Sequence, residues 1–179
     1  MFRSTLLVAL LVTAAFAAPA AADDGKTCHN GKGDAALAAC DRAIASKKAT
    51  GLDLAKLHTS RGVERKRKGD IDGAIADYTE AIKLNPRDPF AFNNRANARR
   101  DKGDLPGAIE DYTTALAIDP GYTAVYVNRG MLRERMKDLA GARADYEAAI
   151  ARPPKYANGR GGQDMARKRL AALGAKPKP

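Results

Sequence analysis

Two cysteines and two histidines are the side chains of this 179-residue sequence best suited to redox or metal chemistry. Cys28, His29, Cys40 and His58 offer four possible metal ligands, but their spacing matches no compact zinc pattern. In a chain that leaves the cytoplasm, two cysteines most simply form one disulfide, and free thiols are the remaining alternative. We therefore expect a Cys28–Cys40 disulfide and no metal site.

Residues that could carry out catalysis do not form a recognisable set. The sequence contains no Ser/His/Asp spacing, no obvious acid/base pair and no phosphate-binding glycine loop. The glycines at 159, 161 and 162 do not follow a strand, so we interpret residues 159–162 as a hinge. We expect no enzymatic activity and no cofactor.

Residues 1–22 have the three parts of a secretory signal peptide. A short basic start ends at Arg3, residues 6–18 are apolar, and Ala20 and Ala22 are small residues at two possible cleavage points. An uncleaved membrane anchor is the alternative, but the apolar run is shorter than the roughly 20 residues that span a bilayer. We expect cleavage after Ala22, no later transmembrane segment, and a periplasmic or secreted mature protein.

The composition indicates helices. Alanine supplies much of the apolar content, tryptophan is absent, and the formal net charge is +10. Alanine favours helices, whereas strands prefer the β-branched and aromatic residues that are scarce here. The charge alone suggests a polyanionic partner.

Three segments of equal length repeat without a gap: residues 55–88, 89–122 and 123–156. Each segment has an amphipathic pattern, a turn ending in Asp, a second helical pattern and a proline near its end. We expect Asp70, Asp104 and Asp138 to cap the second helices. The residues in register at positions 20, 24, 27 and 32 are Ala74, Ala108 and Ala142; Tyr78, Tyr112 and Tyr146; Ala81, Ala115 and Ala149; and Pro86, Pro120 and Pro154.

This pattern resembles the tetratricopeptide repeat. The resemblance implies an all-α fold, a right-handed superhelical stack of antiparallel helix-turn-helix hairpins, with one repeat in each of the three segments. The flanking segments are then an N-terminal arm with a truncated repeat helix (23–54), and a C-terminal capping helix with a basic tail (157–179). Within them we expect helices over 31–44 and 164–173, and a capping box formed by Thr50 and Asp53.

Charged residues also recur at fixed positions of the repeat. Arginine occupies position 7 and aspartate occupies position 23 in every unit, and these positions lie on facing helices. Because buried charges are seldom left unpaired, we expect structural ion pairs rather than ligand contacts. The residues concerned are Arg61, Arg95 and Arg129 with Asp77, Asp111 and Asp145.

The resemblance implies a concave groove that binds peptides and is lined by the first helix of each repeat. Asn94 and Asn128 recur at position 6, where amide groups can bind a peptide backbone in both directions. A solvated polar face is the alternative interpretation. The candidate groove residues are Lys56, Ser60, Lys66, Arg67, Asn93, Asn94, Asn97, Arg100, Asn128 and Met131.

These features together predict a non-catalytic scaffold that binds a protein or peptide in the cell envelope. The alternative is electrostatic binding of an acidic polymer or anionic envelope surface by the basic first repeat and tail. Self-association is also possible, whereas the scarcity of aromatic residues argues against nucleic acid. The carboxylate clamp of chaperone-adaptor members of the family is not expected, because only Asn94 fits it.

Overall fold

The computed structural model describes residues 23–174, and helices are its only regular elements in that range. The predicted signal peptide and residues 175–179 of the basic tail lie outside the described residues. The helices are α1 (Asp24–Asn30), α2 (Gly33–Ala45), α3 (Gly51–Arg67), α4 (Ile71–Leu84), α5 (Pro89–Lys102), α6 (Leu105–Ile118), α7 (Thr123–Arg135), α8 (Leu139–Ala151) and α9 (Gly159–Gly174).

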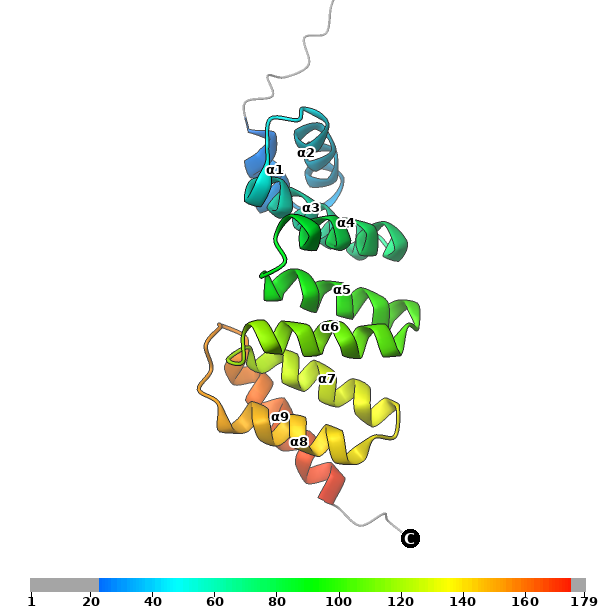
Figure 1. Cartoon of the computed structure of the whole chain (residues 1–179), viewed down its shortest axis with the longest axis vertical. Coiled ribbons are helices and arrows are strands. Elements are labelled where there is room, and N and C mark those ends of the chain that lie inside the picture. The colour runs from blue at the N-terminus through cyan, green and yellow to red at the C-terminus, as the bar shows by residue number, and fades with distance from the viewer. Residues whose placement is uncertain (1–22, 175–179) are drawn as a thin grey trace, which may run out of the picture.

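Consecutive helices pair into antiparallel hairpins that stack along one axis. The pairs are α1–α2, α3–α4, α5–α6 and α7–α8, and the second helix of each hairpin packs on the first helix of the next. Figure 1 shows the resulting elongated stack, closed at its C-terminal end by α9. The all-α hairpin stack expected from the sequence is therefore confirmed.

An aspartate cap begins the second helix of each repeated hairpin. The Asp70 carboxylate accepts a hydrogen bond from the Gly73 N–H at 2.9 Å, and Asp104 and Asp138 do the same for Gly107 and Gly141. These bonds satisfy amide groups that have no partner within the helix. The preceding turn is left-handed in each hairpin, with φ of 86° at Gly69 and 95° at Gly103, but of 65° at Lys137.

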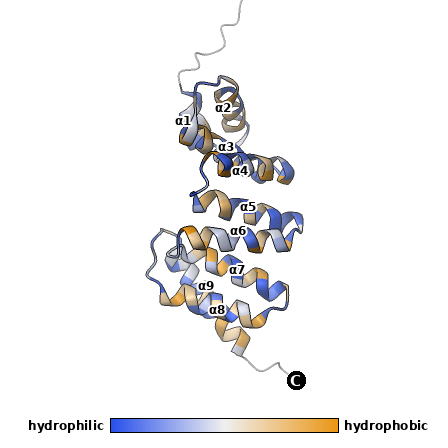
Figure 2. Ribbon diagram, in the orientation of Figure 1, coloured by the Kyte–Doolittle hydropathy of each residue, from blue (hydrophilic) through white to orange (hydrophobic). Residues whose placement is uncertain are grey.

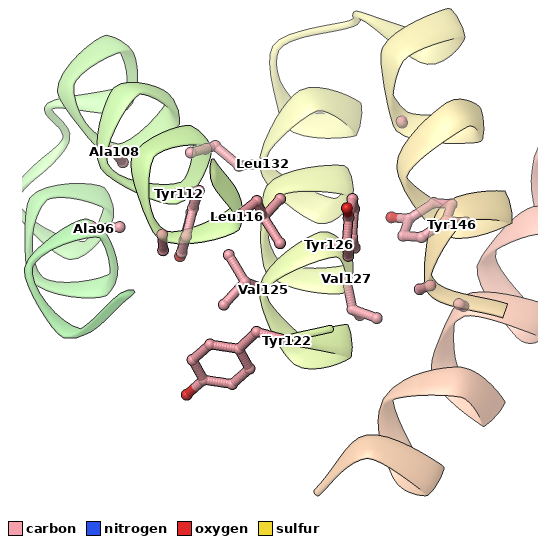
Figure 3. Close-up of a cluster of buried hydrophobic side chains, with 14 of the residues drawn as sticks. Ala96, Ala108, Tyr112, Leu116, Tyr122, Val125, Tyr126, Val127, Leu132 and Tyr146 are labelled. Atoms are coloured by element: carbon pink, nitrogen blue, oxygen red, sulfur yellow. The ribbon is translucent and has the colours of Figure 1, made fainter. Parts of the chain in front are cut away.

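Small residues let the helices of a hairpin approach closely. A Cβ atom added at Gly62 would lie 2.7 Å from the ring of Tyr78, and Gly130 faces Tyr146 in the same way. Figure 3 shows how larger side chains fill the space between neighbouring helices, with Leu116 between α6 and α7. One hairpin cannot bury these surfaces alone, so stacking stabilises the fold.

Hydrophilic and hydrophobic residues occur on every helix of the stack, as Figure 2 shows. This mixture is typical of helices that bury one side and expose the other. Among residues 23–174, no helix is both long enough and apolar enough to cross a membrane.

The segment expected to be an N-terminal arm forms a helix. Residues 24–30 form α1, which pairs with α2 and also contacts α3. A disulfide of 2.10 Å joins Cys28 of α1 to Cys40 of α2, so the two sulfur atoms bond each other rather than a shared metal. The expected capping box does not form: α3 begins after Thr50, but Thr50 makes no side-chain cap, and Asp53 pairs with Lys56 at 3.0 Å.

The predicted glycine hinge at 159–162 is wrong, because α9 already begins at Gly159. These glycines permit close packing of the helix. A Cβ at Gly159 would lie 2.7 Å from Pro154, and one at Gly162 would touch Ala124 of α7. Gln163 then donates to the main-chain carbonyl of Arg152 at 2.7 Å, which anchors α9 to the end of α8.

Candidate functional site

Each predicted arginine and aspartate pair lies within one hairpin, between its first and second helices. The Nη2 to Oδ1 distance is 2.6 Å for Arg61 and Asp77, and the aspartate is 2% exposed. The same distance is 2.8 Å for Arg95 and Asp111, and 2.7 Å for Arg129 and Asp145. Burial makes these charge-assisted hydrogen bonds strongly dependent on both partners.

A second arginine contacts each of these aspartates, whereas the pairing expected from the sequence used position 7 alone. Arg65, Arg99 and Arg133 stand at position 11, and their Nη1 atoms lie 2.8, 2.9 and 2.8 Å from the other oxygen of the same aspartate. In the first hairpin, His58 adds a further contact, with Nδ1 3.0 Å from Asp77. The regular recurrence of arginine at position 11 is the sequence signal that points to this arrangement.

The arginines at position 7 also reach back to the preceding hairpin. Arg61 donates to Asp41 of α2 at 2.9 Å, and Arg95 and Arg129 donate to the hydroxyls of Thr79 and Thr113 at 3.2 and 2.9 Å. Each guanidinium therefore joins two hairpins, and each of its three nitrogens donates to a side chain of the protein.

The remaining predicted site residues lie on the face formed by α1, α3, α5 and α7, called here the first-helix face. Between α3 and α5 this face contains a cavity of about 240 Å³, called here the α3–α5 cavity. It brings together four of the predicted groove residues with two apolar or aromatic neighbours. The lining residues are Val63, Lys66, Arg67, Tyr78, Asn94 and Asn97.

Ion pairs hold the charged side chains beside this cavity. Lys66 and Arg100 both contact Asp101, at 2.7 and 2.8 Å. Arg67 donates to the buried carboxylate of Glu64 at 2.8 Å, and Glu64 also accepts the Gly33 N–H of α2 at 2.7 Å. These contacts fix the cationic groups in place while leaving each of them further N–H donors.

The hydrogen bonds to Glu64 lower its pKa. Burial opposes ionisation of Glu64, but the Gly33 N–H and the Arg67 guanidinium outweigh burial and hold the pKa of this carboxyl below its ordinary value. Burial likewise opposes ionisation of Asp101, yet Lys66 and Arg100 lower its pKa. Both groups are therefore anions at neutral pH, and the cations beside the cavity are held by formed carboxylates.

The asparagines at position 6 do not form a continuous ladder. Asn128 of α7 donates to Asn93 of α5 at 3.2 Å, and Asn93 is buried. This bond bridges the two helices, so the structure separates Asn93 and Asn128 from Asn94. Met131 lies further along α7 and is partly exposed.

The last helix covers part of the first-helix face. A Cβ atom added at Gly162 of α9 would lie 3.7 Å from Ala124 and from Val127 of α7, so α9 packs against this first helix. Arg169 of α9 also lies 3.6 Å from Glu134 of α7. The open part of the first-helix face is therefore its N-terminal half.

The predicted residues Lys56 and Ser60 lie toward α1. A second cavity of about 230 Å³ lies between α1 and α3, and His29 of α1 contributes to it. The His29 ring is 3.2 Å from the Ser60 hydroxyl. Sequence reasoning missed this contribution because it treated residues 23–30 as an arm, although the Cys28–Cys40 pairing implied that they lie close to α2.

The profile of the tetratricopeptide repeat family matches two stretches of the chain, residues 60–123 and 123–156. Together these stretches run from the middle of α3, inside the first repeated segment, to residue 156 at the end of the third segment.

Solved structures of similar architecture include two domains that are in complex with a partner. The first tetratricopeptide repeat domain of Spaghetti (RPAP3), bound to the HSP90 peptide SRMEEVD, is 26% identical; the match covers 68% of this chain and 97% of that domain, with a TM-score of 0.57. The TPR2B domain of yeast Sti1, in its complex with pHsp70, is 27% identical over 64% of this chain and 97% of its own, with a TM-score of 0.56.

A third similar structure supports the fold alone. A tetratricopeptide repeat protein from Parabacteroides merdae is 23% identical, over 77% of this chain and 54% of its own, with a TM-score of 0.63.

Proposed function

Because this chain belongs to the tetratricopeptide repeat family, we propose that it is a non-catalytic scaffold that binds an extended peptide segment of a partner protein. The peptide lies along the open half of the first-helix face. Support comes from the peptide-bound domain of Spaghetti (RPAP3), which shares the hairpin stack.

The α3–α5 cavity is the observation that carries this proposal. Lys66, Arg67, Asn94 and Asn97 come from two helices and surround one space on the first-helix face. Amides can bind a peptide backbone at both its C=O and N–H groups, and the flanking cations favour acidic residues. On the C-terminal side, the Asn93–Asn128 bond and α9 limit the length of the groove.

We place this activity outside the cytoplasm, in the cell envelope. The signal-like segment at residues 1–22 and the Cys28–Cys40 disulfide both support that address, because disulfides persist in oxidising compartments.

Binding of an acidic polymer is less well supported. The basic side chains of α3 have carboxylate partners: Lys56 pairs with Asp53, Lys66 with Asp101, and Arg67 with Glu64. Such pairing weakens the field that a polyanion would need.

Affinity capture from an envelope extract tests the proposal. The mature protein is compared with Asn94→Ala, which removes an amide from the cavity, and with Asn128→Ala, whose amide is bonded to Asn93 away from it. We expect the first variant to lose proteins that the second retains. Equal recovery by all three baits would contradict the proposal, and thermal unfolding checks that both variants are folded.

Salt dependence separates the two candidate functions. Polyanion binding uses many ionic contacts and should weaken steeply between low and high salt, whereas a peptide held by amides, a shaped cavity and few ionic contacts should weaken much less. A steep loss of the captured proteins with salt would favour the polymer.

A further inference from the structure

One tyrosine of the repeated set differs from its two counterparts in the bonding of its hydroxyl. Tyr112 donates to Asn97 at 2.7 Å, and Tyr146 donates to Glu134 at 2.5 Å. The equivalent Tyr78 is 1% exposed, and no residue of the described range 23–174 accepts its hydroxyl proton. The Tyr78 side chain lines the α3–α5 cavity.

The sequence explains why Tyr78 has no internal partner. Asn97 and Glu134, the two acceptors used elsewhere, stand at positions 9 and 12 of their repeats. In the first repeat these positions hold Val63 and Lys66, neither of which can accept a hydrogen bond. No fully buried side-chain N or O atom of the described residues lacks a hydrogen-bond partner, so the Tyr78 hydroxyl is accessible from the cavity, where water or a ligand can act as its acceptor.

The other polar groups around the cavity are mainly donors. The Asn97 oxygen accepts the Tyr112 hydroxyl proton, and no residue in the range 23–174 accepts a hydrogen bond from the Asn97 amide N–H groups. Lys66 and Arg67 each have N–H groups beyond those that contact Asp101 and Glu64. The six residues around the cavity include no carboxylate, and beside it the three cations Lys66, Arg67 and Arg100 share only two carboxylates, Asp101 and Glu64. The local excess of one positive charge is too small to attract a polyanion but can compensate a single carboxylate.

We propose that the α3–α5 cavity is a specificity pocket for one Asp or Glu side chain of the bound peptide. Tyr78 Oη–H and the Asn97 amide donate to its carboxylate, and Lys66 and Arg67 compensate its charge. This pocket rests on the proposed peptide-binding function and deepens it. The residues involved stand at positions 9, 12, 13 and 24 of the repeat and, from α5, at positions 6 and 9.

A carboxylate suits this pocket better than a neutral carbonyl. A carboxylate has two oxygens that accept several hydrogen bonds, and donors to a charged acceptor form stronger bonds than donors to a neutral one. Burial raises the pKa of the Tyr78 hydroxyl, so this group stays a donor throughout the physiological range. An extended peptide also has the length to reach the pocket from the open first-helix face.

Selection from a displayed library of random dodecapeptides tests the pocket. On the mature wild-type protein we expect enrichment of peptides with Asp or Glu at one fixed position. Replacing that residue by Gln or Asn in a synthetic peptide should weaken binding at least tenfold. Tyr78→Phe should weaken the acidic peptide about tenfold while leaving the thermal midpoint unchanged, because no internal hydrogen bond is lost.

Two further variants complete the design. Val63→Asn copies the acceptor of the second repeat, so it should bond Tyr78, fill the pocket and remove the preference for acidic peptides. Tyr146→Phe removes a hydroxyl that is bonded to Glu134 outside the pocket, and it should bind as the wild type does.

The possible outcomes separate the pocket from the scaffold. Enriched peptides without a fixed acidic residue, or equal binding by Tyr78→Phe and wild type, would overturn the pocket and leave the scaffold proposal standing. If no peptide is enriched, both proposals fail.

Discussion

At the scale of single residues, three buried aspartates carry most of the polar organisation of the stack. Each accepts hydrogen bonds from two arginines of the same hairpin, as Asp111 does from Arg95 and Arg99. The cost of burying such charges is offset only while every partner is present. These six arginines and three aspartates are therefore structural, and together they account for only +3 of the formal net charge of +10.

Replacing Asp111 by Ala should be among the most damaging single changes. It leaves Arg95 and Arg99 without their carboxylate in a half-buried setting, and removing one partner of a buried pair costs about 3–5 kcal/mol. Chemical denaturation should show this loss of stability. The neighbouring Glu110→Ala, at an exposed position, should change stability by less than about 0.5 kcal/mol and is the matched control.

Glu64 should make stability depend on acid. Its pKa is lower in the folded protein than in the unfolded chain, so its contribution is complete above the unfolded pKa and is lost as pH falls through the folded value. Denaturation from pH 7 to pH 3 should therefore show a smaller acid loss for Glu64→Gln than for wild type. At pH 7 that variant should be less stable by about 1–3 kcal/mol. Parallel pH profiles would contradict this assignment.

The pairs within a hairpin were predictable from the sequence, because positions 7 and 23 recur in every unit and only one partner type fits. The Asn93–Asn128 bond was not, since it depends on how closely α5 and α7 approach. The lack of an acceptor for Tyr78 was also not predictable, because it shows only when the hydroxyl contacts of Tyr78, Tyr112 and Tyr146 are compared in the folded protein.

At the scale of elements, the turn inside each repeated hairpin follows a simple local rule with one exception. Gly69 and Gly103 occupy the left-handed turn before the aspartate cap, but the third hairpin has Lys137 there. The same bonds hold this turn as in the other hairpins: the Asp138 N–H donates to the Arg133 carbonyl at 2.9 Å, and the Asp138 carboxylate accepts the Gly141 N–H. Glycine adopts this region without the steric cost that a side chain adds.

Lys137→Gly should therefore stabilise the protein by about 1 kcal/mol, since relief of the left-handed strain exceeds the added chain entropy. A higher thermal midpoint would record this gain. Gly103→Ala is the reciprocal variant and should lower the midpoint. A lower midpoint for Lys137→Gly would show that its side chain makes a stabilising contact.

The beginning and end of helices were only partly predictable. The aspartate caps were predicted because each aspartate stands directly before a helical pattern. The bond from the Gly73 N–H to the Asp70 carboxylate is one example. The start of α9 was misjudged because glycine is permissive both in hinges and in close packing. The contacts of Gly159 with Pro154 and of Gly162 with Ala124 show that these glycines serve close packing.

At the scale of the whole molecule, each hairpin contacts mainly its neighbours, so stability is nearly a sum of local terms. The disulfide lies at one end, where α1 and α2 contact α3. The open half of the first-helix face lies near that same end, so the disulfide supports one wall of the candidate groove.

Loss of the disulfide should consequently have a local effect. In Cys28→Ser, Cys40→Ser, the terminal hairpin should lose about 2–4 kcal/mol of stability. Hydrogen exchange should then accelerate in residues 24–45, while α5 to α8 keep wild-type protection. Uniform acceleration along the chain would show that the stack unfolds as one cooperative unit.

The backward reach of the position-7 arginines gives the stack a direction. The guanidinium donates to the residue at position 25 of the preceding hairpin, as Arg95 does to Thr79 and Arg129 does to Thr113. A repeat such as residues 89–122 thus carries both the donor for the hairpin before it and the acceptor for the hairpin after it. A duplicated copy of residues 89–122 inserted after residue 122 would bring both groups, so the same arginine-to-threonine bond would be available at each new junction. These bonds therefore favour growth of the stack in whole repeats.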